Sequence, residues 1–571
     1  MNKSPDSRHT PLALRCALLL SRYHWQRWEA CTDNPRATQS ELLLRIVRQN
    51  RSSAFGRDHG FSAIKTIEDY RKQVPIGDYE CFRPYIDRAR QGEKSVLTDE
   101  SILMFTMTSG STGEPKLIPV TESTWANHSR LTRLWYSRAF QDHPGSAAGK
   151  VFGLVGRPVE GYTTGSIPYG AASGLIYQSS PAWIKRTHAL PYEIAGIKDF
   201  QAKYYVAMRL AIEQDVTFLG TPNPSTILRL VETADRFRDE IIKDIHDGTL
   251  SDRFELTHDI RASLMRRLSS NRVRAQELGK SLAAAGRLRP IDYWSHLKLI
   301  GCWKGGSVGV RLKELAAWFG DAMPTRDLGY MASEAQMSLP ISDDGSAGIL
   351  AVDANFFEFI AESEIGSADP ITLGCDELEV GGVYYVILTS AAGLYRYDIN
   401  DVIQVTGFHG KTALVEFLRK GRDVTNITGE KLHVNQVIGA MELAQSATGA
   451  AVQHFCAFAD VGESRYAFMV EFDGTKPNQE TLKDLLGELD TRLSGLNVEY
   501  ADKRKSARLK APVLCLMNPG WFERKASAAL HAGARDVQFK AQLLGVTPED
   551  PVEIICTVEH SDAAASSNRQ N

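Results

Sequence analysis

The sequence of 571 residues lacks several features that would assign it to a specialised class of protein. None of its eight cysteines forms a C-x-x-C pair, which argues against a zinc ribbon or a thioredoxin-like motif. No apolar run is long enough to span a bilayer, and Arg15 interrupts the short leucine-rich segment near the N-terminus, so we expect neither membrane insertion nor a signal peptide. The formal net charge of -3 does not indicate a nucleic-acid-binding protein. These absences favour a cytoplasmic protein with reduced thiols.

The residues that are present predict a large α/β protein. Hydrophobic residues make up 43% of the chain, which is enough for a large core and for more than one domain. Apolar strand-like runs followed by turns, and usually by helices, occur at residues 151–156, 216–231 and 296–306. Strands that alternate with helices predict an α/β architecture with a largely parallel sheet.

Other periodicities occur before and after these segments. Leucines and aromatic residues recur every three or four positions over residues 12–50, and residues 65–93 read as two helices separated by Pro75 and Gly77. Over residues 377–408, β-branched and aromatic residues alternate between tight turns, which predicts an antiparallel β subdomain.

The pattern changes again after about residue 420, where a strand pair, a helix and another strand predict a small α+β domain. We therefore predict an N-terminal domain over residues 1–418 and a C-terminal domain over residues 419–571. The last dozen residues are rich in Ser, Ala and Asn, and we expect them to be disordered. The sequence gives no indication of an oligomeric state.

The segment TSGSTGEPK, residues 108–116, is the first candidate for a binding site. Its small residues free backbone amides to cradle an anion, its hydroxyls add donors, and Lys116 adds a mobile positive charge, so it suits a polyphosphate. It is not a Walker A loop, because Glu114 and Pro115 separate Gly113 from the lysine. From composition alone, a simple Gly/Ser hairpin turn remains an equal alternative.

Further motifs follow this segment in order. LGYMASEA contains Tyr330, Ser333 and Glu334, and LYRYDINDV contains Tyr395, Arg396 and Asp398; NITGEKL at residues 426–432 and Gln538-Phe539-Lys540 come later. TSGSTGEPKLIPVT resembles the phosphate-binding signature of adenylate-forming enzymes. Together the motifs resemble the Gretchen Hagen-three family of auxin-responsive acyl-acid amido synthetases, in its bacterial-type branch. One departure is Tyr397, which lies where that family usually has a small hydrophobic residue.

This resemblance implies a fold and a reaction. The fold would be a large N-terminal adenylation domain that binds ATP and the acyl acid, with a β subdomain and a smaller mobile lid domain. The reaction would be ATP-dependent: a carboxylic acid forms an acyl-AMP with release of pyrophosphate, and an amine such as an amino acid then displaces AMP. The enzyme would be a ligase that forms a carbon–nitrogen bond.

The resemblance also implies roles for individual residues. Lys540 would reach the α-phosphate during adenylation, and Glu334 would bind Mg²⁺, which prefers hard oxygen ligands shared with phosphate. Asp398 would accept hydrogen bonds from the ribose, and Tyr330 would lie near the adenine. The implied nucleotide-binding set comprises Thr108, Ser109, Gly110, Ser111, Thr112, Gly113, Lys116, Tyr330, Ser333, Arg396 and Asp398.

Plainer structural explanations exist for several of these residues. Glu334 could be an acid at a helix N-terminus beside the capping residue Ser333, Asp398 a turn aspartate, and Arg396 a partner for nearby carboxylates. Lys431 could act near the hinge or be a surface charge. Residues 161–174 and 220–230 either line the acyl cleft or form structural turns.

Three other functions remain open from the sequence. Gly305-Gly-Ser307-Val-Gly309 matches the G-x-S-x-G motif between a strand and a helix, so a serine hydrolase that uses Ser307 is a rival hypothesis. An acyl-CoA ligase would share the adenylation step and pass the acyl group to a thiol instead. A scaffold protein that has lost activity is the third. The sequence does not identify the acid or the acceptor.

Overall fold

The protein is described here from a computed structural model. The structure describes residues 23–108, 116–157, 159–305, 312–365, 367, 370–421, 424–425, 427, 430, 432–460, 462–472, 477–505, 509–531, 543–546 and 553–559. The chain divides into two compact units. The N-terminal unit comprises Met1–Ile399 and Ile403–Phe417, and the C-terminal unit comprises Asn400–Val402 and Leu418–Asn571.

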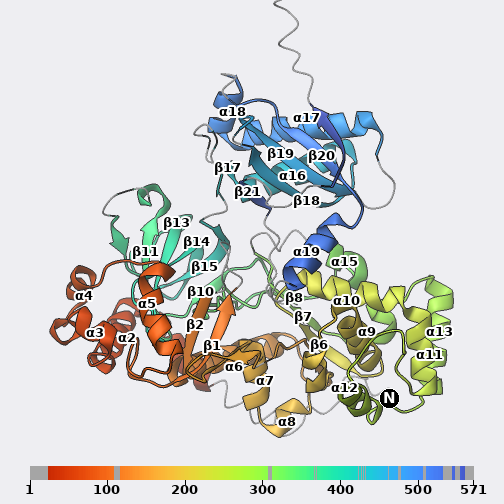
Figure 1. Cartoon of the computed structure of the whole chain (residues 1–571), viewed down its shortest axis with the longest axis horizontal. Helices are drawn as coiled ribbons and strands as arrows, with labels where there is room; N and C mark the ends of the chain where they lie inside the picture. Colours follow the sequence, from red (N-terminus) through yellow and green to blue (C-terminus); the bar gives the residue numbers. More distant parts are fainter. Residues whose placement is uncertain are drawn as a thin grey trace, which may run out of the picture. The chain divides into compact units, whose positions relative to one another are not determined.

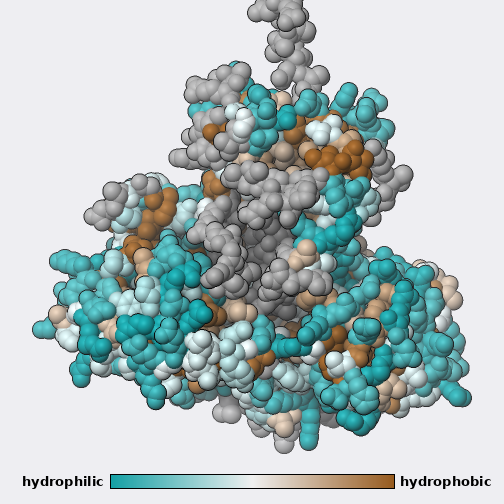
Figure 2. All heavy atoms as spheres, viewed as in Figure 1, coloured by the Kyte–Doolittle hydropathy of each residue, from teal (hydrophilic) through white to brown (hydrophobic). Residues whose placement is uncertain are grey.

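Short helices open the N-terminal unit. Residues 23–32 are helical, and they are followed by α2 (Pro35–Gln49), α3 (Ala54–Asp58), α4 (Ile67–Gln73) and α5 (Tyr79–Arg90). Thr66 begins α4 with a capping box to Asp69, and the Asp78 side chain accepts the first free N–H groups of α5. The predicted break between two helices near Pro75 and Gly77 is thus confirmed. The outer face of α3 and α4 is mostly hydrophilic, as Figure 2 shows.

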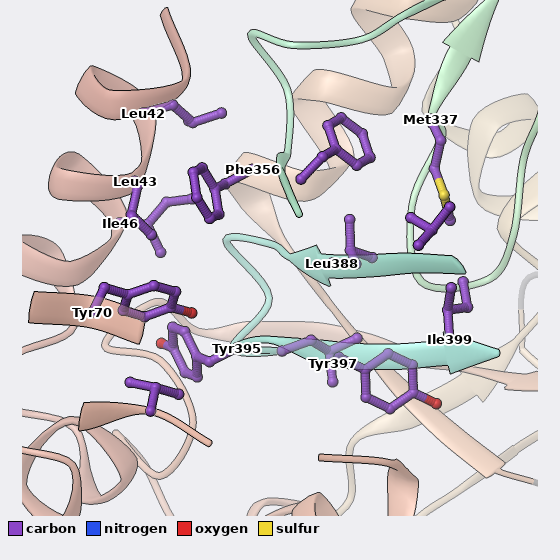
Figure 3. Packing of buried hydrophobic residues seen from close by; sticks show 14 of the residues in the cluster. Leu42, Leu43, Ile46, Tyr70, Met337, Phe356, Leu388, Tyr395, Tyr397 and Ile399 are labelled. Carbon is purple, nitrogen blue, oxygen red and sulfur yellow. The ribbon is translucent and has the colours of Figure 1, made fainter. Parts of the chain in front are cut away.

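These helices pack on a sheet that corresponds to the predicted antiparallel β subdomain. Its order is β12 (Thr372–Leu373), β11 (Phe356–Ala361), β13 (Val383–Thr389), β14 (Tyr397–His409), β15 (Thr412–Lys420), β10 (Gly348–Leu350) and β9 (Ser338–Leu339). The β11–β13, β11–β12, β10–β15 and β10–β9 pairs are antiparallel. Figure 3 shows Leu43 and Ile46 of α2 facing Tyr70 and Phe356, beside Tyr395.

A parallel sheet lies at the centre of the second half of this unit. It comprises β3 (Lys150–Phe152), β6 (Val216–Gly220), β7 (Leu299–Gly301) and β8 (Thr325–Arg326), in that order and all parallel. This confirms the α/β architecture predicted from the alternating strands and helices.

Helices cover both faces of the parallel sheet, as such sheets require. Leu219 and Ile300 pack against α9, α10 and α15, which gather beside β6, β7 and β8 in Figure 1. Phe218 and Leu299 face the opposite way, toward Trp135 of α6. The helices of this region are α6 (Glu122–Asp142), α7 (Ala172–Ser179), α8 (Ala182–Lys185), α9 (Phe200–Ala211), α10 (Pro224–Arg236), α11 (Arg238–Asp247), α12 (His258–Met265), α13 (Arg272–Ala285), α14 (Pro290–Tyr293) and α15 (Leu312–Phe319).

A third sheet carries the first predicted motif. β1 (Ile102–Thr108) pairs antiparallel with β2 (Lys116–Thr121) and parallel with β5 (Pro168–Gly170), which pairs with β4 (Gly161–Tyr162). Short 3₁₀ turns occur at Phe61–Ala63, Tyr192–Gly196 and Glu362–Glu364.

The C-terminal unit contains one sheet and several helices, which confirms the predicted α+β character. Its sheet has the order β21 (Leu544–Val546), β18 (Val452–Asp460), β19 (Arg465–Phe472), β20 (Val513–Met517) and β22 (Ile554–Glu559). The other elements are β16 (Val424–Thr425), β17 (Leu432–His433), α16 (Val434–Thr448), α17 (Gln479–Leu496), α18 (Val498–Lys505) and α19 (Trp521–His531).

Alternate residues of β18 bury opposite faces of this sheet. Phe455 and Ala457 pack in the core formed with α16 and α17, whereas Cys456 and Phe458 pack toward Trp521 of α19.

Within the described part of the whole chain, no helix is both long and apolar enough to cross a membrane.

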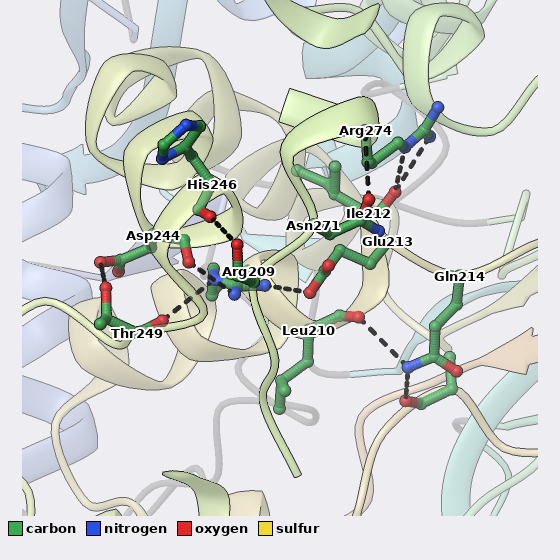
Figure 4. A network of polar contacts seen from close by, with 12 residues as sticks. Arg209, Leu210, Ile212, Glu213, Gln214, Asp244, His246, Thr249, Asn271 and Arg274 are labelled. Carbon is green, nitrogen blue, oxygen red and sulfur yellow. Dashed lines mark hydrogen bonds and ion pairs between the residues drawn. The ribbon is translucent and has the colours of Figure 1, made fainter. Parts of the chain in front are cut away.

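A buried polar network ties α9 to α11 (Figure 4). Arg209 has no exposed surface; it pairs with Glu213 and donates to the main-chain oxygens of Asp244 at 2.8 Å and Thr249 at 3.2 Å. The Asp244 carboxylate in turn accepts from the Tyr205 hydroxyl at 2.6 Å. Each buried polar group therefore depends on its neighbours for compensation of its lost hydration.

Replacing this arginine tests the network. We expect Arg209→Met to lower the free energy of unfolding of the N-terminal unit by about 3 kcal/mol, because it leaves buried acceptors unpaired. Arg253→Met is the matched control, since Arg253 pairs with Glu240 at the surface, and its loss should cost less than about 1 kcal/mol. Urea unfolding measures both, and equal losses in the two variants would contradict the assignment.

Candidate functional site

The carboxyl ends of the parallel strands bring several loop segments together. The Trp303 N–H, after β7, donates to the Pro222 oxygen, after β6, at 2.8 Å. The Trp303 indole N–H donates to the Gly329 oxygen, after β8, at 3.2 Å. In open α/β sheets, ligands bind outside the carboxyl ends of the strands, so this edge is the candidate site.

Asp327 joins two of these segments. It is buried, and its two carboxylate oxygens accept main-chain N–H groups from Lys304 and Gly329, each at 2.6 Å. Burial raises the pKa of Asp327 to about 6, although these hydrogen bonds oppose the shift. The carboxylate therefore fixes the end of β7 relative to the end of β8.

Tyr330 follows directly and is largely buried. Its N–H donates to the Ser338 hydroxyl at 3.0 Å, and its ring stacks on Phe417 with centroids 5.6 Å apart. Tyr330 thus lies at the candidate edge and packs against the end of β15. Its proximity to an adenine stays a prediction.

Ser333 and Glu334 lie in a tight turn after Tyr330. The turn is closed by a bridge between Met331 and Gln336 and by the Ala332 N–H donating to the Ala335 oxygen at 2.9 Å. No helix begins at this part of the described chain, so the alternative that Glu334 is a helix-capping acid is wrong. The preference of Ser for caps does not decide here because the chain turns back to pair with itself.

The Glu334 carboxylate faces β14. The Tyr397 hydroxyl lies 3.5 Å from Glu334 Oε1, within reach of a long hydrogen bond. Tyr397 is buried, and its ring packs edge-on against Phe82 of α5 with centroids 5.7 Å apart. Tyr397, the residue that departs from the family pattern, therefore contacts the predicted site residue Glu334.

Arg396 is held within the fold. It has a positive φ of 46°, and its guanidinium donates to the buried Glu358 carboxylate at 2.9 Å, to the main-chain oxygens of Arg71 and Val74, and to Thr372. These contacts favour the alternative that Arg396 is a structural partner for a nearby carboxylate, which the sequence had left open. A role in nucleotide binding stays a prediction.

Asp398 lies two residues into β14, where its N–H donates to the Gly77 oxygen at 2.8 Å. Its side chain is partly exposed. Because Asp398 belongs to a strand, the turn-aspartate alternative is wrong. Its predicted contact with a ribose is not tested by these observations.

The predicted phosphate segment begins and ends on a hairpin. Thr108 of β1 lies opposite Lys116 of β2, so the strands hold the two ends of the segment side by side. Residues 109–115, including Ser109, Gly110, Ser111, Thr112 and Gly113, lie outside the described residues, as does the side chain of Thr108. The Lys116 ammonium lies 5.3 Å from the ring centroid of Tyr79.

Other predicted residues also lie outside the described part of the chain. They are Lys431, Lys540 and Ser307. The strand and helix expected around Ser307 are present as β7 and α15. Asp327, a downstream acid at the same edge, uses both carboxylate oxygens for main-chain N–H groups, which does not favour a role as the acid of a catalytic triad.

A small pocket opens at the carboxyl end of β3, and the sequence gave no signal for it. It is lined by Gly153, Leu154, Val155, Tyr177, His188, Leu190, Pro191, Ile194 and Ala195. Burial, with a smaller contribution from Lys150, lowers the pKa of His188 to about 4, so its imidazole is neutral near pH 7. Residues 161–174 lead from β4 through β5 into α7, which carries Tyr177.

Glu334 is a suitable but incomplete ligand for a divalent cation. No group of three or more His, Cys, Asp or Glu side chains within the described residues could hold a metal ion. Mg²⁺ commonly takes one or two carboxylates and completes its shell with phosphate and water oxygens. The residues present therefore fit an ion that arrives with a polyphosphate.

Three sequence models of domains match the chain. The GH3 family N-terminal domain matches residues 24–324, the GH3 family central domain matches residues 348–420, and the GH3 family C-terminal domain matches residues 435–548. GH3 abbreviates the family that the motifs resemble.

Relatives match along most of their length. Jasmonoyl–L-amino acid synthetase JAR4 of Nicotiana attenuata is 23% identical over 540 residues, covering 90% of this chain and 92% of that protein. Indole-3-acetic acid-amido synthetase GH3.4 of Arabidopsis thaliana is 24% identical, covering 91% of each.

Solved structures show the same fold. The GH3.15 acyl acid amido synthetase has a TM-score of 0.82 at 20% identity, covering 98% of each chain. A 2-hydroxyisobutyryl-CoA ligase in the postadenylation state has a TM-score of 0.51 at 13% identity, covering 96% of this chain and 94% of that one. The expected adenylate-forming architecture, with a large N-terminal and a smaller C-terminal part, is thus confirmed.

The titration of Asp327 gives a testable pH dependence. Its pKa is raised from 3.8 to about 6, so the folded protein holds this proton more tightly than the unfolded chain. The resulting stabilisation is fully present below about pH 4 and is lost as the pH rises through about 6. At about 1.4 kcal/mol per pKa unit, it amounts to about 3 kcal/mol.

Asp327→Asn removes this titration. We expect the free energy of unfolding of the wild type, relative to that of Asp327→Asn, to fall by about 3 kcal/mol between about pH 4 and pH 7. Urea unfolding of both proteins across this range measures the difference. A difference that stays constant with pH would show that Asp327 has an ordinary pKa.

Proposed function

The chain belongs to the GH3 family, and from this premise we propose that it is an ATP-dependent acyl-acid amido synthetase. Such an enzyme is a ligase that joins a carboxylic acid to an amine, here most simply an amino acid. The observation that carries the proposal is the match of all three family domains, together with the placement of Tyr330, Glu334 and Asp398 in one unit.

The reaction has two steps. A carboxylate oxygen attacks the α-phosphorus of ATP, the bond to the β-phosphate oxygen breaks, and pyrophosphate leaves with that electron pair to give an acyl-AMP. The nitrogen of the amine then attacks the acyl carbon, the bond to the AMP oxygen breaks, and the amine loses a proton. The enzyme must align the carboxylate with phosphorus and stabilise charge on the phosphate oxygens.

We place the phosphates at the hairpin of β1 and β2. The paired ends at Thr108 and Lys116 support this placement, since they present a short segment of small, hydroxyl-bearing residues beside a lysine. In this proposal Ser109, Ser111, Thr112 and Lys116 hold the departing β- and γ-phosphates. Gly110 and Gly113 let the main chain approach them.

The remaining nucleotide contacts are assigned to the carboxyl edge. Glu334 binds Mg²⁺, which neutralises phosphate charge when it is bound. Tyr330 and Ser333 contact the adenosine, and Asp398 accepts from the ribose hydroxyls. The buried pairing of Arg396 with Glu358 supports a role in holding the start of β14 in place.

We propose that the pocket at the carboxyl end of β3 binds the apolar part of the acid. Its lining is apolar apart from Tyr177 and the neutral His188, which suits an uncharged hydrocarbon or aromatic group. It lies after β3, and the other strands of the same sheet, β6, β7 and β8, end at the candidate edge. The carboxylate would then point toward that edge.

We assign ATP and acid binding to residues 1–418 and a mobile lid to residues 419–571. Lys540 in the lid would approach the α-phosphate only when the lid closes, where a late-arriving charge stabilises the transition state most. We also place the protein in the cytoplasm, because all seven cysteines among the described residues are free thiols.

Separation of nucleotide products tests the proposed function. The protein is mixed with Mg-ATP, a panel of aromatic and aliphatic carboxylic acids, and the amino acids. We expect acid-dependent AMP and pyrophosphate, with a new mass equal to an amide. ADP would overturn the mechanism, a thioester formed only with coenzyme A would favour the ligase alternative, and labelling of Ser307 by a fluorophosphonate would favour the hydrolase.

Glu334→Gln tests the magnesium assignment. We expect acid-dependent ATP–pyrophosphate exchange to fall by roughly 10²-fold and the Mg²⁺ concentration for half-maximal rate to rise, because a neutral amide binds the ion weakly. Glu364→Gln, in the turn at Glu362–Glu364, is the control and should keep wild-type exchange. An unchanged Mg²⁺ dependence in Glu334→Gln would remove this residue from the metal site.

Lys540→Ala tests the lid assignment. We expect the variant to fold normally and to lose acyl-AMP formation by roughly 10²-fold or more. Lys510→Ala, which breaks the exposed pair of Lys510 with Glu463, serves as the control in the same unit. Wild-type exchange in Lys540→Ala would contradict the assignment.

A further inference from the structure

A segment outside every motif contacts the elements that carry the predicted nucleotide residues. It runs from Gly77 to Phe82, through the start of α5. The Gly77 N–H donates to the Arg396 oxygen at 3.2 Å, and the Gly77 oxygen accepts from the Asp398 N–H at 2.8 Å. Both bonds are main-chain bonds, so they fix the start of β14 against α5 whatever side chains β14 carries.

Tyr79 connects the same segment to β2. Its hydroxyl accepts the Leu117 N–H at 2.9 Å, and its ring lies under the Lys116 ammonium, 5.3 Å from the centroid. The side chain is buried, with 4% of its surface exposed. A ring that is fixed to β2 by its own hydroxyl thus provides a fixed surface for the lysine of that strand.

Phe82 extends the contacts to a third element. Its ring packs edge-on against Tyr397, whose hydroxyl lies 3.5 Å from the Glu334 carboxylate. One turn of α5 therefore contacts β2, which carries Lys116, and β14, which carries Asp398. Through the Tyr397 side chain it also reaches the turn that carries Glu334.

There is little free space around this segment. A Cβ built on Gly77 would lie 2.9 Å from the Cβ of Cys81, so even alanine at position 77 would force a shift of the backbone. Arg83 also lies over the Tyr79 ring, at 5.1 Å, and pairs with Glu80. The ring thus has two cations near it, and the Glu80 carboxylate offsets the charge of Arg83.

We propose that Tyr79 is a positioning residue for ATP binding, which holds Lys116 where it meets the phosphates. The proposal rests on the proposed function, because it takes Lys116 as a phosphate ligand. Lysine has a flexible stem, and a side chain already oriented loses less freedom when it binds an anion. Tyr79 acts through Lys116 and through the position of β2, and is not a catalytic residue.

Substitutions at Tyr79 separate its two contacts. Tyr79→Phe keeps the ring under the lysine and removes the acceptor for Leu117, whereas Tyr79→Leu removes both. Tyr85→Phe is the matched control, because Tyr85 lies on the same helix and its hydroxyl donates to Asp58 instead. Thermal unfolding identifies any variant that fails to fold.

The readouts are the dissociation constant of ATP, measured without acid, and the KM and kcat of acid-dependent AMP formation. We expect Tyr79→Leu to raise the dissociation constant and KM for ATP by about 3- to 10-fold, with kcat and the KM for the acid changed less than about twofold. Tyr79→Phe should show a smaller effect and Tyr85→Phe none.

Specific results would overturn the proposal. One is an ATP dissociation constant of Tyr79→Leu equal to that of Tyr85→Phe. The other is a parallel loss of stability, kcat and acid affinity in Tyr79→Leu, because such a loss indicates a merely structural residue. If the wild type makes no AMP with any acid, the proposed function fails separately. The ATP dissociation constants then still decide whether Tyr79 positions Lys116.

Discussion

Parallel pairing of β3, β6, β7 and β8 is the constraint on which the proposed site depends. Because all four strands run the same way, their carboxyl ends reach one edge, and the polar segments that follow them must meet there. The sheet is tightly packed at this edge: a Cβ on Gly301 would lie 2.9 Å from the Phe218 ring and 3.1 Å from the Trp135 ring. Asp327 then fixes the segments after β7 and β8 through two main-chain bonds, so the backbone that carries Tyr330 and Glu334 is set before any ligand binds.

Much of the fold could be predicted from the sequence because its signals are local. The apolar runs at β6 and β7, each followed by a Gly- or Pro-containing turn, predict buried parallel strands, and the strand pair, helix and strand after about residue 420 predict a small α+β domain. The turn at Ser333 and Glu334 was not predictable in this way. A Ser-Glu pair also suits a helix start, and only pairing of Met331 with Gln336 decides between the two structures.

The candidate site was predictable only where motifs mark it. Tyr330, Glu334 and Asp398 were found by resemblance, and Lys116 also by the composition of its segment. Their spacing along the chain says nothing about the segments that hold them together. Arg396 was included with them because it belongs to a motif, yet the four hydrogen bonds that its guanidinium donates all go to groups of the fold. Tyr79 and His188 gave no signal, since a lone tyrosine at a helix start and a lone histidine in a loop are common. Their proposed roles rest on contacts between residues far apart in sequence.

The most direct test of this account is the fate of the carboxylate oxygen. An acid that supports turnover is labelled with ¹⁸O in its carboxylate, and the AMP formed in the complete reaction is analysed by mass spectrometry. Attack of the carboxylate on the α-phosphorus, followed by displacement of AMP by the amine, predicts AMP that carries one labelled oxygen. Unlabelled AMP, or label recovered in inorganic phosphate with ADP as the nucleotide product, would contradict adenylation of the acid at this site.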